Sequence, residues 1–237
     1  MKLVIDPKAQ PELAGRIDRF LIQREESVLS KLVAIGGVAQ EKSFEIQVKV
    51  KDVDLEILES RLKRLSEVRF VRGSERHQYD TYFIFDDRWG SRLRYREDEV
   101  VNLDTGEIID VIYRLTLTSM AKEREFENSV LLSQSRFDAP ATRSLRFYHE
   151  YFRPQRTVEV HKSRRRFHVR FGGTDLALNF DRITKPIDGH TFLEIKSRTW
   201  SRQDAERKAA LISDLLTLLE VPPAALVKAE YPDLAQP

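Results

Sequence analysis

The sequence predicts an α+β fold in which helices flank an antiparallel β-sheet, and three observations indicate it. Several segments alternate between apolar and polar residues, most strictly SFEIQVKVKD (43–52), as a half-buried strand does because successive side chains point to opposite faces. Other segments carry leucines at helical spacing, as in VDLEILESRLKRL (53–65). Glycine and aspartate separate extended segments at NLDTG (102–106) and FGGTD (171–175), where hairpin turns need the positive φ that these residues tolerate.

Four helices are expected in this sequence. The first, over residues 11–35, has apolar residues at roughly helical spacing and ends at two glycines, which are a helix stop signal. The second covers residues 53–65, and a short third helix covers residues 141–152. The last, over residues 201–220, begins at Ser201, which is placed as its N-cap, and two prolines follow its end.

About eight strands account for the remaining regular structure. No linker between the elements is long enough to mark a domain boundary. The expected strands are residues 43–52, 76–85, 91–98, 110–118, 124–132, 157–171, 174–183 and 190–198.

The expected strands have one face of charged side chains, mostly basic, and one face of large apolar ones. In SRLRYRED (91–98), for example, three arginines oppose a leucine and a tyrosine. Two architectures accommodate this pattern. In an open sheet, helices cover the apolar face and the charged face meets solvent. In a closed barrel the charged faces line the interior, where the cations repel one another unless carboxylates or an anionic ligand compensate them. The barrel hypothesis therefore implies an anionic ligand.

Composition narrows the class of protein. With 40 basic and 38 acidic residues the chain has a net charge of only +2, so no overall field attracts it to nucleic acid or to a membrane surface. The absence of cysteine excludes disulfides, thiolate nucleophiles and Cys-ligated zinc, and it fits a reducing compartment. No apolar run approaches the ~18 residues of a membrane span. We therefore expect a cytoplasmic protein whose partners include neither nucleic acid nor membrane.

A series of short motifs resembles the CYTH, or triphosphate tunnel metalloenzyme, superfamily. EIQVK (45–49) is similar to the family's E-x-E-x-K signature, with Gln47 in place of the second glutamate. Further motifs follow in the family's order: QYDTY (78–82), RLR (92–94), REFE (124–127), KSR (162–164), FDRI (180–183) and FLEIK (192–196). Over about residues 43–220 the resemblance implies a closed eight-stranded antiparallel β tunnel barrel with a polar, charged interior and flanking helices. The CYTH-like domain is expected over residues 41–237, after an N-terminal helical extension over residues 1–40.

The resemblance also implies a metal-dependent enzyme that acts on a linear triphosphate. Class IV adenylate cyclase, thiamine triphosphatase and inorganic triphosphatase belong to this family, and the sequence does not choose between water and a ribose hydroxyl as the nucleophile. Arginine and lysine suit phosphate oxygens, and carboxylates suit Mg²⁺ or Mn²⁺. The implied catalytic residues are Glu45, Lys49 and Glu194; the substrate-binding residues are Lys49, Arg92, Arg94, Arg114, Lys162, Arg164, Arg166 and Lys196; and the metal ligands are Glu45, Gln47, Glu125, Glu127, Asp181 and Glu194.

Three departures from the family pattern bear on this assignment. Gln47 lacks a negative charge, Lys196 stands in place of the last glutamate, and Thr118 stands where the family has a lysine. Arg114 lies on the same strand face as Thr118, about 7 Å away, and its long side chain is placed to serve instead. The site has fewer carboxylates as a result, which favours one metal ion over two.

Other interpretations of the sequence stay open or fail. A non-catalytic module that binds polyphosphate or a nucleotide through an eroded metal site is one alternative, and an interaction scaffold with a solvated charged sheet is another. The oligomeric state is open, and a homodimer is compatible with the sequence. GGVAQEKS (36–43) is no phosphate-binding loop, because Glu41 replaces its second glycine and a strand follows it. The histidines lack zinc-ligand spacing, and no G-x-S-x-G motif occurs.

Overall fold

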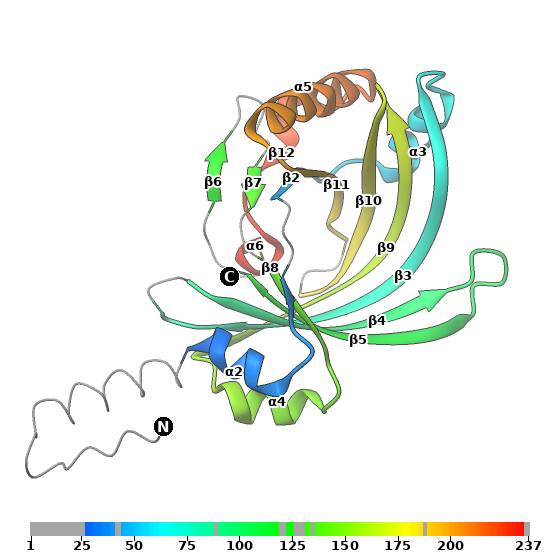
Figure 1. The fold of residues 1–237 in the computed structure, drawn as a ribbon. Helices are drawn as coiled ribbons and strands as arrows, with labels where there is room; N and C mark the ends of the chain where they lie inside the picture. Colours follow the sequence, from blue (N-terminus) through cyan, green and yellow to red (C-terminus); the bar gives the residue numbers. More distant parts are fainter. Residues whose placement is uncertain are drawn as a thin grey trace, which may run out of the picture.

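The computed structural model describes residues 27–40, 44–87, 90–118, 122–125, 131–133, 136–186 and 189–234, and a curved antiparallel sheet dominates it (Figure 1). The strands are β1 (Ala39–Gln40), β2 (Phe44–Lys51), β3 (Val68–Ile84), β4 (Arg92–Val101), β5 (Ile108–Thr118), β6 (Lys122–Glu125), β7 (Leu131–Ser133), β8 (Arg136–Pro140), β9 (Arg156–Phe171), β10 (Thr174–Lys185), β11 (Thr191–Thr199) and β12 (Leu226–Val227). The helices are α2 (Val28–Ile35), α3 (Leu55–Arg64), α4 (Leu145–Phe152), α5 (Arg202–Leu218) and α6 (Tyr231–Leu234), with a 3₁₀ turn at Pro223–Ala225.

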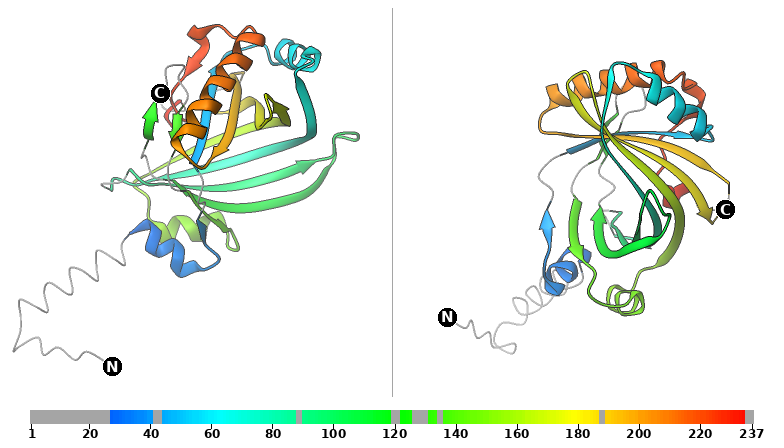
Figure 2. Two further views of the ribbon diagram at one scale, coloured as in Figure 1. Left: turned by 45° about the horizontal axis from the view of Figure 1, so that its top comes forward. Right: turned by 90° about the vertical axis from the view of Figure 1, so that its right-hand side faces the viewer.

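The predicted closed eight-stranded barrel is wrong. Within the described residues the sheet has 12 strands and is open, running in the order β1-β8-β5-β4-β3-β9-β10-β11-β2-β7-β6, with β12 paired to β2. No described residues of β1 pair with β6 to close it. Alternation along a strand fixes which face a side chain occupies, and it is the same in a closed barrel and in a curved open sheet, so the sequence pattern could not decide closure. The curvature leaves one face concave, as two further views show (Figure 2).

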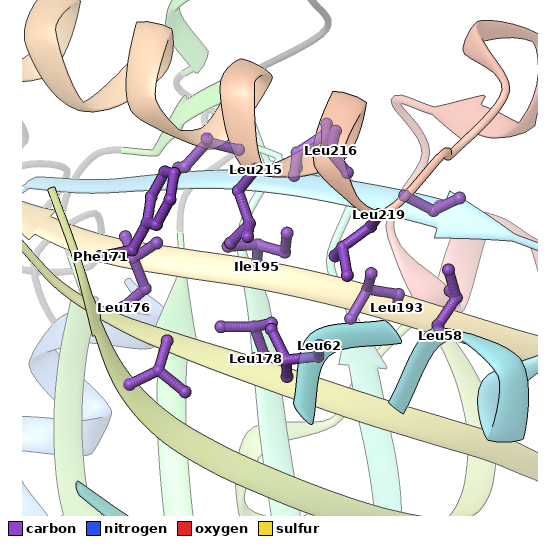
Figure 3. Close-up of a cluster of buried hydrophobic side chains, with 14 of the residues drawn as sticks. Leu58, Leu62, Phe171, Leu176, Leu178, Leu193, Ile195, Leu215, Leu216 and Leu219 are labelled. Atoms are coloured by element: carbon purple, nitrogen blue, oxygen red, sulfur yellow. The ribbon is translucent and has the colours of Figure 1, made fainter. Parts of the chain in front are cut away.

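Two helices, α3 and α5, cover the apolar convex face of the sheet over β2, β10 and β11. The apolar cluster between these helices and the sheet includes Leu178, Leu193, Ile195 and Leu215, which are all fully buried (Figure 3). Ser201 caps α5 by accepting a hydrogen bond from the Asp204 amide, as its position in the sequence predicts. Burying the apolar side of these strands under helices directs their polar side to the concave face.

The helices α2 and α4 cover the convex face at β3, β4 and β5. Leu32 of α2 and Tyr148 of α4 are fully buried against Phe83, Leu93 and Leu115. Only residues 28–35 of the expected first helix are described as helical, and residues 11–26 lie outside the described part of the chain. In the described part of the chain, no helix has both the length and the apolar character needed to cross a membrane.

The chain after α5 has structure that the sequence patterns did not predict. It forms a 3₁₀ turn that begins at the second of two prolines, then β12, which pairs with Val50 and Lys49 of β2, and then α6. Tyr231 at the start of α6 is buried and packs edge-on against Phe192. The C-terminal segment therefore returns to the sheet and becomes part of its polar side.

Candidate functional site

The concave face of the sheet holds a pocket of about 810 Å³. Basic side chains outnumber acidic ones in its lining. Six residues that the sequence singled out line it: Glu45, Arg94, Arg114, Arg164, Arg166 and Lys196. They come from β2, β4, β5, β9 and β11, so the pocket gathers side chains that are distant in sequence.

Asp80 of β3 lies at the centre of a buried ion-pair cluster at one end of this face. Arg96 donates hydrogen bonds from Nε and Nη2 to its two oxygens at 2.5 and 2.6 Å, and Lys162 Nζ donates to Oδ2 at 3.2 Å. Burial alone raises the pKa of the Asp80 carboxyl, but the Arg96 and Lys162 cations outweigh it and hold that pKa well below its ordinary value. Asp80 is therefore an anion that neutralises cations from two neighbouring strands.

Lys162 is almost fully buried, and its charge is only partly compensated. Burial lowers its pKa, Asp80 raises it, and the nearby Arg164 lowers it further, to about 7. Because the ordinary pKa of lysine is 10.5, the Lys162 side chain binds more protons in the unfolded chain than in the folded protein between about pH 7 and 10.5. Below about pH 7 the buried ammonium lowers the free energy of unfolding. This loss of stability disappears as the pH rises from about 7 to 10.5 and the ammonium of the unfolded chain is deprotonated as well.

We expect this linkage to appear in the pH dependence of stability. Between about pH 7.5 and 9.5 the free energy of unfolding should rise more steeply with pH in the unmodified protein than in Lys162→Met, by up to about 1.4 kcal/mol per pH unit. Urea unfolding at several pH values measures both slopes. All other titrating groups are common to the two proteins, so parallel curves would mean that Lys162 keeps an ordinary pKa.

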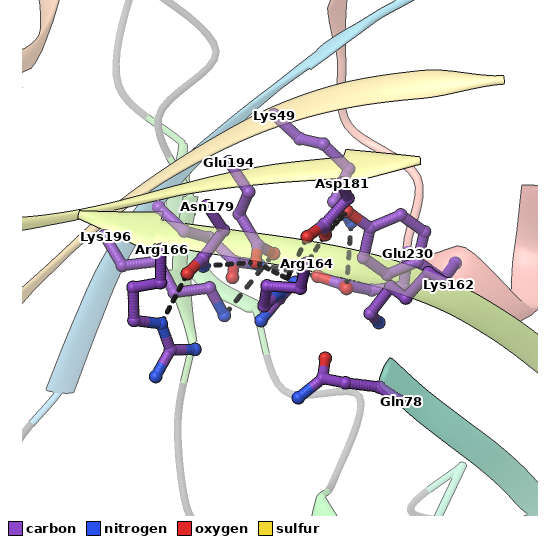
Figure 4. A network of polar contacts seen from close by, with 12 residues as sticks. Lys49, Gln78, Lys162, Arg164, Arg166, Asn179, Asp181, Glu194, Lys196 and Glu230 are labelled. Carbon is purple, nitrogen blue, oxygen red and sulfur yellow. Dashed lines mark hydrogen bonds and ion pairs between the residues drawn. The ribbon is translucent and has the colours of Figure 1, made fainter. Parts of the chain in front are cut away.

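Arg164 of β9 forms the centre of a second cluster (Figure 4). Its Nε donates to Asp181 Oδ1 at 2.6 Å, and its Nη2 donates to both Asp181 and Glu194, the latter at 3.1 Å. Asp181 also accepts a hydrogen bond from the Tyr231 hydroxyl, and Asn179 Nδ2 donates to Glu194 at 3.0 Å. Burial would raise the pKa of Glu194, but Lys196 and Arg164 hold it well below its usual range. Arg164 is thus a paired cation.

The geometry around Lys196 tests whether the expected ligands fit a divalent metal. A metal ion would need carboxylate oxygens that converge on one point. Instead, Lys196 Nζ lies 3.0 Å from Glu45 Oε1 and 3.4 Å from Glu194 Oε1, so an ammonium occupies the place between these carboxylates. Nowhere in the described ranges do three acidic or histidine side chains gather to hold a metal ion. In this arrangement the residues do not fit Mg²⁺ or Mn²⁺.

The other expected metal ligands are placed elsewhere. Asp181 is held by Arg164 and Tyr231, and the amide nitrogen of Gln47 donates to Glu230 at 2.5 Å. Glu125 belongs to β6, and Glu127 lies outside the described residues. Among the described side chains, Glu45, Gln47, Asp181 and Glu194 are therefore not gathered around one point.

The C-terminal segment engages three of the expected phosphate ligands. Lys49 Nζ donates to Glu230 Oε2 at 3.1 Å, and Arg92 forms two hydrogen bonds to Asp233 at 2.7 and 3.0 Å. The Tyr231 ring lies 4.3 Å from the ammonium of Lys49 and equally far from that of Lys162. These three basic residues do not line the pocket. They face an internal acidic and aromatic segment instead.

Arg166 and Gln78, both in the pocket lining, retain unused hydrogen-bonding groups. Arg166 Nε donates to Asn179 Oδ1 at 2.6 Å, and its two terminal nitrogens have no hydrogen-bond partner among the described residues. Burial, and then the neighbouring Arg164 cation, lower the pKa of Arg166 to about 10. Gln78 donates to Asp98, while its buried Oε1 accepts no hydrogen bond within the described part of the chain. Arg166 thus offers a paired set of donors without a facing carboxylate.

Sequence reasoning missed Glu230, Tyr231 and Asp233. The signal that exists is weak: an acidic and aromatic stretch, EYPD (230–233), follows the last helix and its prolines. Nothing in its local pattern indicates where it packs, because the contact with Lys49 joins residues about 180 positions apart.

The chain combines a curved antiparallel sheet with a cation-lined pocket. It belongs to the CYTH domain family, whose model it matches over residues 41–231. Among solved structures, the PH1819 protein of Pyrococcus horikoshii is 16% identical with a TM-score of 0.56, over 80% of this chain and 97% of that one. A Vibrio parahaemolyticus protein proposed to be an adenylate cyclase is 15% identical with a TM-score of 0.51, over 82% and 98%. At these identities the likeness shows a shared fold. No curated protein matches the chain.

Proposed function

We propose that this protein acts on a compound with a linear triphosphate group and that the terminal phosphoryl group is hydrolysed by water. The observation that carries the proposal is Arg166, whose terminal nitrogens point at no described partner in a pocket already lined by basic residues. A triphosphate carries several negative charges in a line. Arg164 and Arg166 are two residues apart on one face of β9, about 7 Å, so the two ends of a triphosphate, rather than neighbouring phosphoryl groups, can each reach a guanidinium.

Membership of the CYTH family supports an enzyme that acts on triphosphates at this coarse level. The likeness to the Vibrio parahaemolyticus protein supports a related reaction, in which a ribose hydroxyl is the nucleophile and the product is a cyclic nucleotide. Both reactions need the triphosphate to be held in a fixed position with its charge offset by cations. Arg166 is the residue that we assign to that task first, with Arg94 and Arg164 beside it, although Arg164 already pairs with Asp181 and Glu194.

A second candidate function is binding of the triphosphate without turnover. The observation that favours it is Lys196, whose ammonium lies between Glu45 and Glu194. An ammonium there supplies one positive charge and can neither take substrate oxygens as ligands nor activate a bound water as a metal ion does. We therefore assign no catalytic step to a metal at this place.

A panel of triphosphates distinguishes the two candidates. The protein is incubated with ATP, GTP, thiamine triphosphate and tripolyphosphate, with Mg²⁺, with Mn²⁺ or with a chelator, while phosphate, pyrophosphate and cyclic nucleotide are measured. We expect release of phosphate from at least one compound. Binding of tripolyphosphate without any product would favour the second candidate, and neither binding nor turnover would reject the proposed function.

The matched variant for this panel is Lys196→Glu. Its new carboxylate adds negative charge beside Glu45 and Glu194, so tripolyphosphate binding in the presence of chelator should weaken, and added Mg²⁺ should restore part of it. Equal binding by the two proteins under both conditions would show that Lys196 does not face the ligand.

A further inference from the structure

The basic rows of the concave face continue beyond the pocket and pass under the C-terminal segment, β12 to α6 (226–234). Arg94 on β4 and Arg164 on β9 line the pocket. Arg92 and Lys162 follow two residues away on the same faces of these strands, and they do not line it. The C-terminal segment contacts both of them instead. It therefore covers the end of a cationic surface of which the pocket is the open part.

The C-terminal segment offers these cations the groups that an anionic ligand would offer. Glu230 accepts a hydrogen bond from Lys49 Nζ at 3.1 Å, and Asp233 accepts two from Arg92 at 2.7 and 3.0 Å. Figure 4 shows Glu230 beside the Arg164 cluster. Burial raises the pKa of Glu230, but the Lys49 cation outweighs it and holds that pKa below its usual value. Both contacts are charge-assisted hydrogen bonds to carboxylate oxygens, a role that phosphate oxygens can also fill.

The attachment of the C-terminal segment is slight compared with that of the long strands. The side chains of Glu230 and Asp233 are each 36% exposed, and ion pairs with such access to water contribute at most about 1 kcal/mol each. β12 pairs with β2 at two positions, and α6 is a single turn of four residues. Tyr231 is its buried apolar anchor. An anion that presents more oxygens to the same cations can therefore compete with the two carboxylates.

We propose that the C-terminal segment is autoinhibitory: Glu230 and Asp233 occupy Lys49 and Arg92, and an anionic ligand in the pocket displaces them. This inference rests on the proposed function, because the displacing ligand is the triphosphate group of that proposal. The apparent affinity for the ligand is lowered in proportion to the fraction of molecules in which the segment is released. Loosening the segment therefore raises the affinity without adding a contact to the ligand.

Titration of tripolyphosphate in the presence of a chelator tests the proposal. The unmodified protein is compared with Asp233→Asn and with the double variant Glu230→Gln/Asp233→Asn, which keep the size of the side chains and remove their charge. We expect the double variant to bind at least about fivefold more tightly and Asp233→Asn to be intermediate. Circular dichroism checks that each variant is folded. If the double variant does not fold, Asp233→Asn alone decides, because this side chain is exposed.

The matched control removes the same number of negative charges elsewhere. Glu56→Gln/Glu150→Gln takes one carboxylate from an exposed ion pair on α3 and one from an exposed ion pair on α4. Its affinity for tripolyphosphate should stay within about twofold of that of the unmodified protein. An equal gain in the control and in the double variant would show a general effect of net charge and would overturn the proposal.

Hydrogen exchange in the unmodified protein separates displacement from a purely electrostatic effect. With saturating tripolyphosphate, the amides of residues 226–234 should exchange at least about tenfold faster, because the segment leaves β2, while those of β3 and β4 should not. If tripolyphosphate binds but this exchange is unchanged or slower, the proposal fails while the proposed function stands, even if the variants bind more tightly. Failure of the unmodified protein and of the variants to bind tripolyphosphate would reject both.

Discussion

Replacing Arg166 by alanine is expected to weaken tripolyphosphate binding by about 1.5 to 3 kcal/mol, the scale of a hydrogen bond to a charged group. This corresponds to roughly 10- to 150-fold in dissociation constant. The reason is that the terminal nitrogens of Arg166 have no hydrogen-bond partner among the described residues, so their full donor capacity is available to a phosphate. Isothermal titration calorimetry at low ionic strength measures the change.

Two comparison variants make this result specific. Arg166→Lys keeps the charge but loses the planar pair of donors, and we expect an intermediate loss of affinity. Arg182→Ala loses an exposed arginine on the opposite side of the same sheet and should leave the affinity unchanged. If Arg166→Ala and Arg182→Ala bind equally well, Arg166 is not a phosphate ligand.

Replacing Asp80 by asparagine is expected to destabilise the protein by about 3 to 5 kcal/mol. The side chain keeps its size but loses its charge, and two buried cations, Arg96 and Lys162, are left without their anion. Urea unfolding followed by circular dichroism measures the loss. Asp175→Asn is the control, because Asp175 pairs with Arg170 at an exposed position and the change should stay within about 0.5 kcal/mol.

A double variant checks the physical cause of that loss. Adding Lys162→Met to Asp80→Asn removes one of the unpaired cations and replaces it with an apolar side chain of similar length. Part of the lost stability should return, as it does when a buried charge and its partner are replaced together. A double variant less stable than Asp80→Asn alone would contradict this account of the cluster.

The sequence was sufficient to predict which side chains share a face. Arg94, Arg164 and Glu194 all occupy the concave side, because the alternation of a strand is a local property that needs no knowledge of its neighbours. The helices that cover the other side could be predicted for the same reason, since the leucine spacing in residues 53–65 and the N-cap at Ser201 are also local.

Three features could not be predicted because they depend on contacts between distant residues. Closure of the sheet depends on whether its two edges meet, which no single strand specifies. The pairing of Arg164 with Asp181 depends on the register between β9 and β10, in which these two residues stand opposite each other. The contact of Glu230 with Lys49 depends on where the C-terminal segment packs. As a consequence, residues assigned to phosphate from their motifs are divided between the pocket and an internal network.

The central claim, that the cation-lined pocket holds a linear triphosphate, is tested most directly by titrating tripolyphosphate into the unmodified protein in the presence of a chelator. The arrangement of Lys196 between Glu45 and Glu194 means that binding should not require a divalent metal. We expect one ligand per chain, with a dissociation constant below about 1 mM and an affinity that falls as salt is added. An absence of binding at millimolar tripolyphosphate, with metal or without it, would contradict the claim.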